Sequence, residues 1–262
     1  MTLLEILNKL DRARREFEKR SIVCFTSDLD WASETACSRT LSFFSSRNIP
    51  VTYFLTHQSH VMTDALQRGV IRAGIHPNFM PGSSQGGNYQ EIVDFCMNLM
   101  PNPRCYRGHR YYEVNDTAEL LYQRGIEFES NICTLMDIVP PFLHRSKMIN
   151  FPIFWEDGAY LYHEGNFDFS EFYNRLRLPG LKIINIHPMH LVLNTPYFSY
   201  TRQIKDDLSR EAWNRMDESA IEQLSWKGSG IAGFIRQMTD AIIRDNIEMA
   251  YLEDIYDEIC RK

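Results

Sequence analysis

Two aspartates one residue apart end an apolar run near the start of this chain, in the stretch FTSDLDWASE at residues 25–34. Such a pair most often caps a helix or forms a turn, but Ser33 already provides a cap for the segment that follows. In an extended segment side chains alternate, so the carboxylates of Asp28 and Asp30 are expected on the same side. Two like charges on one side repel each other unless a cation lies near them. The pair therefore predicts a divalent metal site.

Other polar side chains with catalytic capacity also stand at the downstream ends of apolar runs. They are His76 after AGI, Arg107 after CY, Trp155, Glu156 and Asp157 after FPIF, and His187 after IINI. Each has an ordinary structural alternative, such as a buried histidine or a surface ion pair. In a barrel of parallel strands, however, these strand ends lie on one face, where barrel active sites are built. The pattern predicts one site assembled from distant parts of the sequence.

Short β-branched runs alternate with helix-length amphipathic segments through most of the 262 residues. We expect strands at residues 21–26, 50–56, 70–75, 105–107, 126–130, 149–154, 181–186 and 247–252. Repeated strand–helix–strand units indicate parallel strands joined by crossovers. The sequence therefore predicts an α/β fold, a single distorted (β/α) barrel of about seven strands over residues 1–262. An N-terminal helix at 2–19 and a decorated loop region at 191–230 are expected to complete the domain.

The composition argues against several classes of function. The formal net charge is −6 and Lys and Arg are scattered, so no basic stripe for nucleic acid is expected. No apolar run reaches the roughly 18 residues that a membrane span requires, and residues 2–19 suggest an amphipathic helix rather than a signal peptide. The six cysteines form no CxxC pair, which indicates reduced thiols and a cytoplasmic protein.

One glycine pattern suggests a nucleotide site. The stretch GSGIAG at residues 228–233 fits GxGxxG, with Glu253 downstream of it. A dinucleotide site requires a strand immediately before the glycines, and the preceding AIEQLSWK is polar and helix-like. We therefore expect a loop and the start of a helix there instead.

Taken in order, five motifs resemble those of the NodB-homology polysaccharide deacetylases, carbohydrate esterase family 4. They are FTSDLDW, GIHPNF, YRGHRYY, FWED and INIHP. The similarity covers about residues 20–255, and the chain looks most like the WbmS-like deacetylases of O-antigen loci. The resemblance implies a distorted (β/α) barrel that removes N-acetyl groups from a saccharide. It also implies one divalent metal, Zn²⁺ before Co²⁺, Ni²⁺, Mn²⁺ or Fe²⁺.

The resemblance also implies catalytic roles for residues at the strand ends. Asp28 matches the general base of the family, and Arg107 matches the arginine that steadies this base. His187 matches the general acid, and Asp157 or Glu156 would stabilise its imidazolium form. The expected reaction is hydrolysis of an amide, with acetate and an amino sugar as products.

The match to the family's metal ligands is incomplete. Asp30 and His76 match two of them, but Met80 stands where the family has a second histidine, and thioether sulfur is a poor ligand for Zn²⁺. The candidates for the missing ligand are Asn78, which we favour, Gln85, His109 and His190.

Aromatic side chains near the motifs offer flat faces to a sugar ring. We take Trp31, Tyr111 and Trp155 as the candidate contacts, although most aromatic residues serve ordinary packing. Two other functions stay open. Barrels of this type also host enzymes that open cyclic amides, so the scissile bond need not be an N-acetyl group. A barrel that binds saccharide without hydrolysing it would explain the missing histidine, but it has no need of a base.

Overall fold

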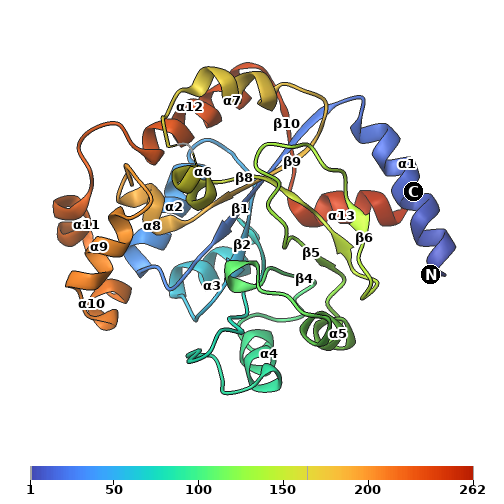
Figure 1. Ribbon diagram of the computed structural model, residues 1–262, viewed down its shortest axis with the longest axis horizontal. Helices are drawn as coiled ribbons and strands as arrows, with labels where there is room; N and C mark the ends of the chain where they lie inside the picture. Colours follow the sequence, from blue (N-terminus) through green and yellow to red (C-terminus); the bar gives the residue numbers. More distant parts are fainter. Residues whose placement is uncertain (1, 164, 262) are drawn as a thin grey trace.

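The structure is a computed structural model that describes residues 2–163 and 165–261. Its centre is a curled β-sheet surrounded by helices, and the first and last helices pack against each other (Figure 1). The strands are β1 (Ser21–Asp28), β2 (Val51–Leu55), β3 (Arg72–Ile75), β4 (Cys105–Tyr106), β5 (Phe128–Glu129), β6 (Phe142–Leu143), β7 (Ile149–Asn150), β8 (Ile153–Glu156), β9 (Gly180–Ile186) and β10 (Glu248–Met249). The helices are α1 (Leu3–Phe17), α2 (Glu34–Ser45), α3 (His60–Gln67), α4 (Tyr89–Met97), the short 3-10 helix η1 (His109–Tyr111), α5 (Asn115–Gln123), α6 (Asp157–His163), α7 (Phe169–Leu176), α8 (Pro188–Val192), α9 (Tyr200–Asp207), α10 (Arg210–Asn214), α11 (Glu218–Leu224), α12 (Ile231–Arg244) and α13 (Leu252–Arg261).

The sheet has the order β6-β7-β5-β4-β3-β2-β1-β9-β8, with β10 beside β1. Its pairs are parallel apart from β6 with β7, which is antiparallel. Beyond β5, residues 132–136 exchange backbone hydrogen bonds with β8, so the sheet curls back on itself. This arrangement confirms the distorted α/β barrel expected from the sequence. Each expected range contains a strand, whereas β6 lies outside all of them. The strands β4, β5, β6, β7 and β10 are only two residues long each.

One expected strand is divided. The run at residues 149–154 forms β7 and β8, which pair with different neighbours, β5 and β9. Pro152 stands between them, and proline has no N–H to donate to a ladder, so a continuous strand there is disfavoured. The break matters for function because it allows β8 to pair with β9, and both strands end at the site.

Helix caps account for several boundaries near the site. The Ser33 side chain accepts a backbone N–H in the first turn of α2, as expected, and Asn88 does the same for α4. Because Ser33 is the cap of α2, neither aspartate of the opening motif is used for capping. The region at 191–230 carries the helices α9, α10 and α11, and residues 228–230 lead into α12 without a preceding strand.

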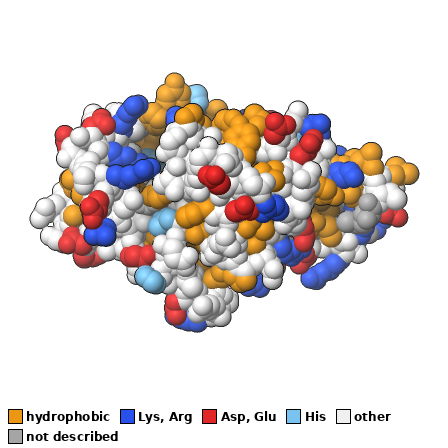
Figure 2. All heavy atoms as spheres, turned by 90° about the horizontal axis from the view of Figure 1, so that it is seen from below, with side chains coloured by type: hydrophobic (Ala, Val, Ile, Leu, Met, Phe, Trp, Pro, Cys, Tyr) orange, Lys and Arg blue, Asp and Glu red, His pale blue; other side chains and the backbone are white. Residues whose placement is uncertain are grey.

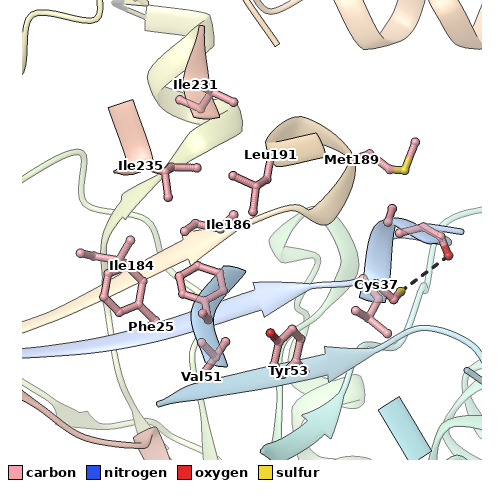
Figure 3. Close-up of a cluster of buried hydrophobic side chains, with 14 of the residues drawn as sticks. Phe25, Cys37, Val51, Tyr53, Ile184, Ile186, Met189, Leu191, Ile231 and Ile235 are labelled. Atoms are coloured by element: carbon pink, nitrogen blue, oxygen red, sulfur yellow. Dashed lines mark hydrogen bonds between the residues drawn. The ribbon is translucent and has the colours of Figure 1, made fainter. Parts of the chain in front are cut away.

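A buried apolar cluster holds the central strands in place. Figure 3 shows Phe25 of β1 and Ile184 of β9 packed beside Leu191 of α8 and Ile235 of α12. All four side chains are buried. Burial of one such side chain contributes about 1.5–3 kcal/mol relative to exposure, so the cluster fixes the carboxyl ends of β1 and β9 firmly. Asp28 and Asp30 stand at the end of β1, and His187 directly follows β9.

Charged side chains of both signs are mixed on the surface. On the face drawn in Figure 2, acidic and basic side chains are interspersed, so that face presents no basic stripe of the kind that nucleic acids bind. Among the described residues, no helix has the length and apolar character that crossing a bilayer requires.

Candidate active site

The polar side chains that follow the central strands meet in one cavity of about 390 Å³ at the carboxyl ends of those strands. Its lining includes Asp28, Asp30, His76, His109, Tyr111, Glu156 and His187. Arg107 and Asp157 are fully buried and form ion pairs with lining residues. The structure thus brings together the strand-end residues that the sequence singled out, apart from Trp155, which does not line this cavity.

The two opening aspartates reach the cavity by different backbone geometry. The strand ends at Asp28, and both Asp30 and Trp31 have left-handed backbone, with φ of 45° and 56°. The alternation of an extended segment, which we expected to align the carboxylates, therefore stops at Asp28, and a turn brings Asp30 to the cavity. Left-handed backbone is uncommon for residues other than glycine and persists where the surroundings hold it. Here the Trp31 N–H donates to the Thr56 hydroxyl at 3.1 Å.

Asp28 is a buried carboxylate with strong partners for both oxygens. Arg107 Nη1 donates to its Oδ1 at 2.8 Å, and Asn185 Nδ2 donates to its Oδ2 at 2.8 Å. Burial alone would raise the pKa of Asp28, but the charges of Arg107, His76 and His187 outweigh it and lower this pKa. The carboxylate therefore stays ionised at neutral pH.

Arg107 is held by more than its ion pair. Its Nε donates to the Ser130 carbonyl at 2.6 Å, and its Nη2 donates to the Ser130 hydroxyl at 2.7 Å. Its guanidinium also lies over the ring of Phe54 at 4.4 Å. A planar fork that binds several acceptors at once is a property of arginine that lysine does not share. The position therefore depends on arginine for geometry as well as charge.

A ladder of polar contacts between the ends of β4 and β5 positions this arginine. The Tyr106 hydroxyl lies 2.7 Å from Glu129 Oε2, Arg107 contacts Ser130 as described, and the Gly108 N–H donates to Asn131 Oδ1 at 2.9 Å. The residues 106–108 thus match 129–131 one for one. The ladder fixes the segment that carries both Arg107 and the following histidine.

Proton counting at the base of this ladder has a clear result. The single hydroxyl proton of Tyr106 faces carboxylate oxygens of both Glu113 and Glu129. One hydroxyl cannot donate to two acceptors, so one carboxyl group must carry a proton of its own. Burial, together with the charge of Glu113, raises the pKa of Glu129 to about 8. Glu129 is therefore the protonated partner near neutral pH. His144 completes a compact group with the two glutamates.

Asp30 lies at the centre of a cluster of metal-ligand type. Its Oδ1 is 3.2 Å from His76 Nε2 and 3.0 Å from His109 Nδ1, and the three ligand atoms lie within 4.8 Å of one another. One carboxylate and two imidazoles are a donor set that Zn²⁺ takes in catalytic sites. The Nδ1 atom of buried His76 has no hydrogen-bond partner among the described residues, and its Nε2 faces Asp30. These three side chains fit a divalent metal.

Asn78, which we favoured from the sequence as the third ligand, has a different environment. The side-chain oxygen of Asn78 accepts the backbone N–H of Met80 at 3.1 Å, and the backbone N–H of Asn78 donates to Gln85 Oε1 at 2.6 Å. Gln85 in turn donates to the carbonyls of Thr56 and His76. Both Asn78 and Gln85 therefore brace the loop after β3, and the structure brings His109 to Asp30 instead.

His187 forms a tight dyad with buried Asp157. Its Nδ1 is 2.6 Å from Asp157 Oδ1, and its backbone N–H donates to the other oxygen of the same carboxylate at 2.7 Å. Burial alone would lower the pKa of His187, but the adjacent Asp157 raises this pKa well above its usual range. Glu156 lies farther off, 3.8 Å from the same nitrogen, and burial raises its pKa to about 7. Of the two acids left open by the sequence, Asp157 holds the imidazole.

His190 lies beside this dyad. It contacts the Thr195 hydroxyl at 3.0 Å, and burial lowers its pKa to about 4. It is therefore neutral near pH 7.

The comparison with protein families is decisive for the class of protein. Residues 25–205, more than half of the chain, match the family model of the WbmS-like polysaccharide deacetylases. The chain belongs to this family. As a member, it is a carbohydrate deacetylase.

One solved structure agrees with the fold of this polysaccharide deacetylase. A crystal structure from Bordetella bronchiseptica, of a protein assigned as a polysaccharide deacetylase involved in O-antigen biosynthesis, has 23% identity and a TM-score of 0.74, with 84% of this chain and 90% of that chain covered. More remote are the peptidoglycan N-acetylglucosamine deacetylase Bc1960 (11% identity, TM-score 0.48, 91% and 89% covered) and a family 4 carbohydrate esterase from Streptococcus mutans (11%, 0.46, 92% and 90%). No curated protein matches the chain.

The expected aromatic contacts of this deacetylase lie in different places. Tyr111 lines the main cavity, and Trp31 stands edge-on to His109 with ring centroids 5.3 Å apart. Trp155 is buried, stacks on Phe234 at 5.7 Å and lines a smaller neighbouring cavity rather than the main one. We therefore do not retain Trp155 as a sugar contact in the main cavity.

Proposed function

We propose that this deacetylase uses a divalent metal to hydrolyse an N-acetyl group on a saccharide, releasing acetate and an amino sugar. One observation carries the proposal: an ionised carboxylate, a supported imidazole and a cluster of metal-ligand type share one cavity. His187 Nε2 lies 3.9 Å from Asp28 Oδ2 and 3.7 Å from Asp30 Oδ2. These distances place the base, the acid and the metal ligand around one point of the cavity.

We propose Asp30, His76 and His109 as the metal ligands. When bound, a divalent metal supplies a Lewis acid that polarises the acetyl carbonyl and makes a water molecule more acidic. Zn²⁺ suits a site of one carboxylate and two imidazoles, and Co²⁺, Ni²⁺, Mn²⁺ and Fe²⁺ accept the same donors. The third ligand then comes from the arginine motif, two residues after Arg107, rather than from the histidine motif.

Asp28 is the general base of the proposed reaction. Its pKa is low, so the carboxylate is ionised, and Arg107 and Asn185 hold it in one orientation. As the water oxygen bonds to the acetyl carbon, the water proton moves to Asp28. Side-chain positions fixed before the reaction avoid the cost of ordering them during it.

His187 is the general acid. Because Nδ1 is bound to Asp157, the proton available for transfer is the one on Nε2, which faces the carboxylates of the cavity. The high pKa of the imidazole keeps it protonated near neutral pH. When the C–N bond breaks, His187 gives this proton to the nitrogen, which leaves as an amine.

Two alternative functions, hydrolysis of a cyclic amide and saccharide binding without catalysis, are distinguished from deacetylation by different observations. A cyclic amide would use the same base and acid, and it is distinguished by ring opening without release of acetate. A barrel that only binds saccharide has no use for an ionised base beside a protonated imidazole.

We also propose a reducing, cytoplasmic setting, because the six cysteines are all free and four of them are buried.

The proposal is tested by metal analysis combined with an acetate-release assay on N-acetylated sugars after loading with Zn²⁺. Asp28→Asn is expected to lose turnover and to keep its metal, whereas Asp30→Asn loses both. Asp64→Asn, an exposed acid paired with Arg68 on α3, is the matched control and should change neither. Wild-type protein without bound metal, or equal metal loss in the two site variants, would contradict the assignment.

A further inference from the structure

A second cavity of about 300 Å³ adjoins the active site and shares three lining residues with it. The shared residues are Asp30, Lys205 and Trp213, and the second cavity is also lined by Trp31, Leu208, Ser209, Arg210 and Asn214. The two spaces therefore form one elongated cleft that leads outward from the catalytic centre along α9 and α10. Such a cleft has room for more than an acetamido group.

The outer lining of this cleft is cationic, although the protein as a whole is acidic. The chain has 34 acidic residues against 28 Lys and Arg. Yet the acids that line the two cavities are Asp28, Asp30 and Glu156, all at the catalytic centre. Among the described lining residues beyond that centre, the charged ones are Arg110, Lys205 and Arg210. This bias runs against the overall composition.

Apart from Asp30, whose charge acts on Lys205, no described acidic residue pairs with these cations. No ion pair or side-chain hydrogen bond links Arg110 or Arg210 to any described residue, and Lys205 Nζ lies over the ring of Trp213 at 4.4 Å. At the catalytic centre, by contrast, Asp28 is paired with Arg107, and His187 is paired with Asp157. The outer cations are therefore available to a ligand.

Arg110 is also held in an unusual backbone conformation. Its φ is 58° and that of Tyr111 is 56°, both in the left-handed region. Backbone hydrogen bonds on either side lock this turn: the His109 N–H donates to the Pro77 carbonyl, and the Tyr111 N–H donates to the Gly108 carbonyl, each at 2.8 Å. Strained residues of this kind concentrate at ligand sites. The turn carries Arg110 on the lining of the main cavity.

We propose that the substrate is an acidic saccharide, in which a carboxylate or phosphate contacts Lys205 and Arg110 while the acetamido group lies at the catalytic centre. Trp31 and Trp213 border the outer part of the cleft and offer ring surfaces to a sugar. This inference rests on the proposed function for the position of the acetamido group. Arg210, farther along the cleft, extends the same preference for negative charge.

The test compares three probes on Zn²⁺-loaded protein: N-acetylglucosamine, its uronic acid analogue, and N-acetylglucosamine 1-phosphate. We expect at least one acidic probe to bind about tenfold or more tightly than the neutral sugar by calorimetric titration, with a preference that weakens as salt is added. The two acidic probes distinguish a carboxylate from a phosphate. Equal dissociation constants for all three probes would overturn the inference.

Variants separate the cations from direct binding of an anion to the metal. Lys205→Met keeps the apolar stem over Trp213, and Arg110→Asn tolerates left-handed backbone. Each should reduce the preference for the acidic probe, measured as the ratio of the dissociation constants of the neutral and acidic probes, severalfold. Arg202→Met, on α9 but outside both cavities, should leave this ratio unchanged. An unchanged ratio in both site variants would also overturn the inference. Tight acidic binding without acetate release would leave the inference standing and contradict the proposed deacetylation.

Discussion

Replacement of Glu129 by glutamine should stabilise the protein near neutral pH. A glutamine at this position keeps an oxygen to accept the Asn150 amide and adds an N–H that can donate to the oxygen of Tyr106. The tyrosine proton is then free for Glu113, so each partner has one donor and one acceptor. The variant thus reproduces the protonated carboxyl group that proton counting requires.

The size of the effect follows from the pKa of Glu129, which is raised from 4.5 to about 8 in the folded protein. Between these values the unfolded chain releases a proton that the folded protein retains, so the free energy of unfolding falls as pH rises and levels off above about pH 8. Each pKa unit is worth about 1.4 kcal/mol, so the loss between pH 4.5 and 7 is about 3 kcal/mol. For a chain of this size, that corresponds to roughly 5–10 °C in Tm.

Urea unfolding of wild type and Glu129→Gln at pH 5, 7 and 8 measures this difference. The advantage of the variant should be small at pH 5 and should grow toward pH 8. Glu119→Gln, an exposed acid paired with Arg145, is the control and should show no such trend. A variant that is less stable than wild type at pH 8, or a difference independent of pH, would refute the assignment of a proton to Glu129.

Three further variants examine how the catalytic groups are positioned. Arg107→Met removes the charge that lowers the pKa of the base, so the acid limb of the kcat/KM profile should move to higher pH, and an unmoved limb would count against the ion pair. Asp157→Asn removes the charge that raises the pKa of His187, so the alkaline limb should move to lower pH and kcat should fall about 10²-fold. Gly108→Ala would force a Cβ into the carbonyl oxygen of Tyr112, across the turn that carries the proposed ligand His109, so metal content and turnover should fall together. Gly233→Ala, whose Cβ meets open space, should spare both.

The sequence was informative where function follows directly after a strand. Asp28, Arg107 and His187 could be singled out because each ends an apolar run, and parallel strands bring such ends together. The packing role of Trp155 could not be predicted, because an aromatic residue beside a motif has the same local pattern whether it binds a sugar or fills the core. The distinction depends on Phe234, which is distant in the sequence.

Local sequence patterns could not single out His109 among the four candidates for the third metal ligand. His109 lies beyond a two-residue strand, and its position depends on a left-handed turn and on a hydrogen bond to the carbonyl of Pro77. The ladder that supports Arg107 joins strands about 23 residues apart, a separation that periodicity does not encode. Asn185, however, stands two positions before His187, so alternation along β9 could have identified it as a partner in the site.

The central claim is that Asp30, His76 and His109 hold one metal ion that the deacetylation requires. Its most direct test is the metal content of wild type and His109→Gln, measured on the same samples as acetate release after loading with Zn²⁺. About one metal ion per wild-type chain is expected, with metal and turnover both lost in the variant. Full metal occupancy and turnover in His109→Gln would contradict it.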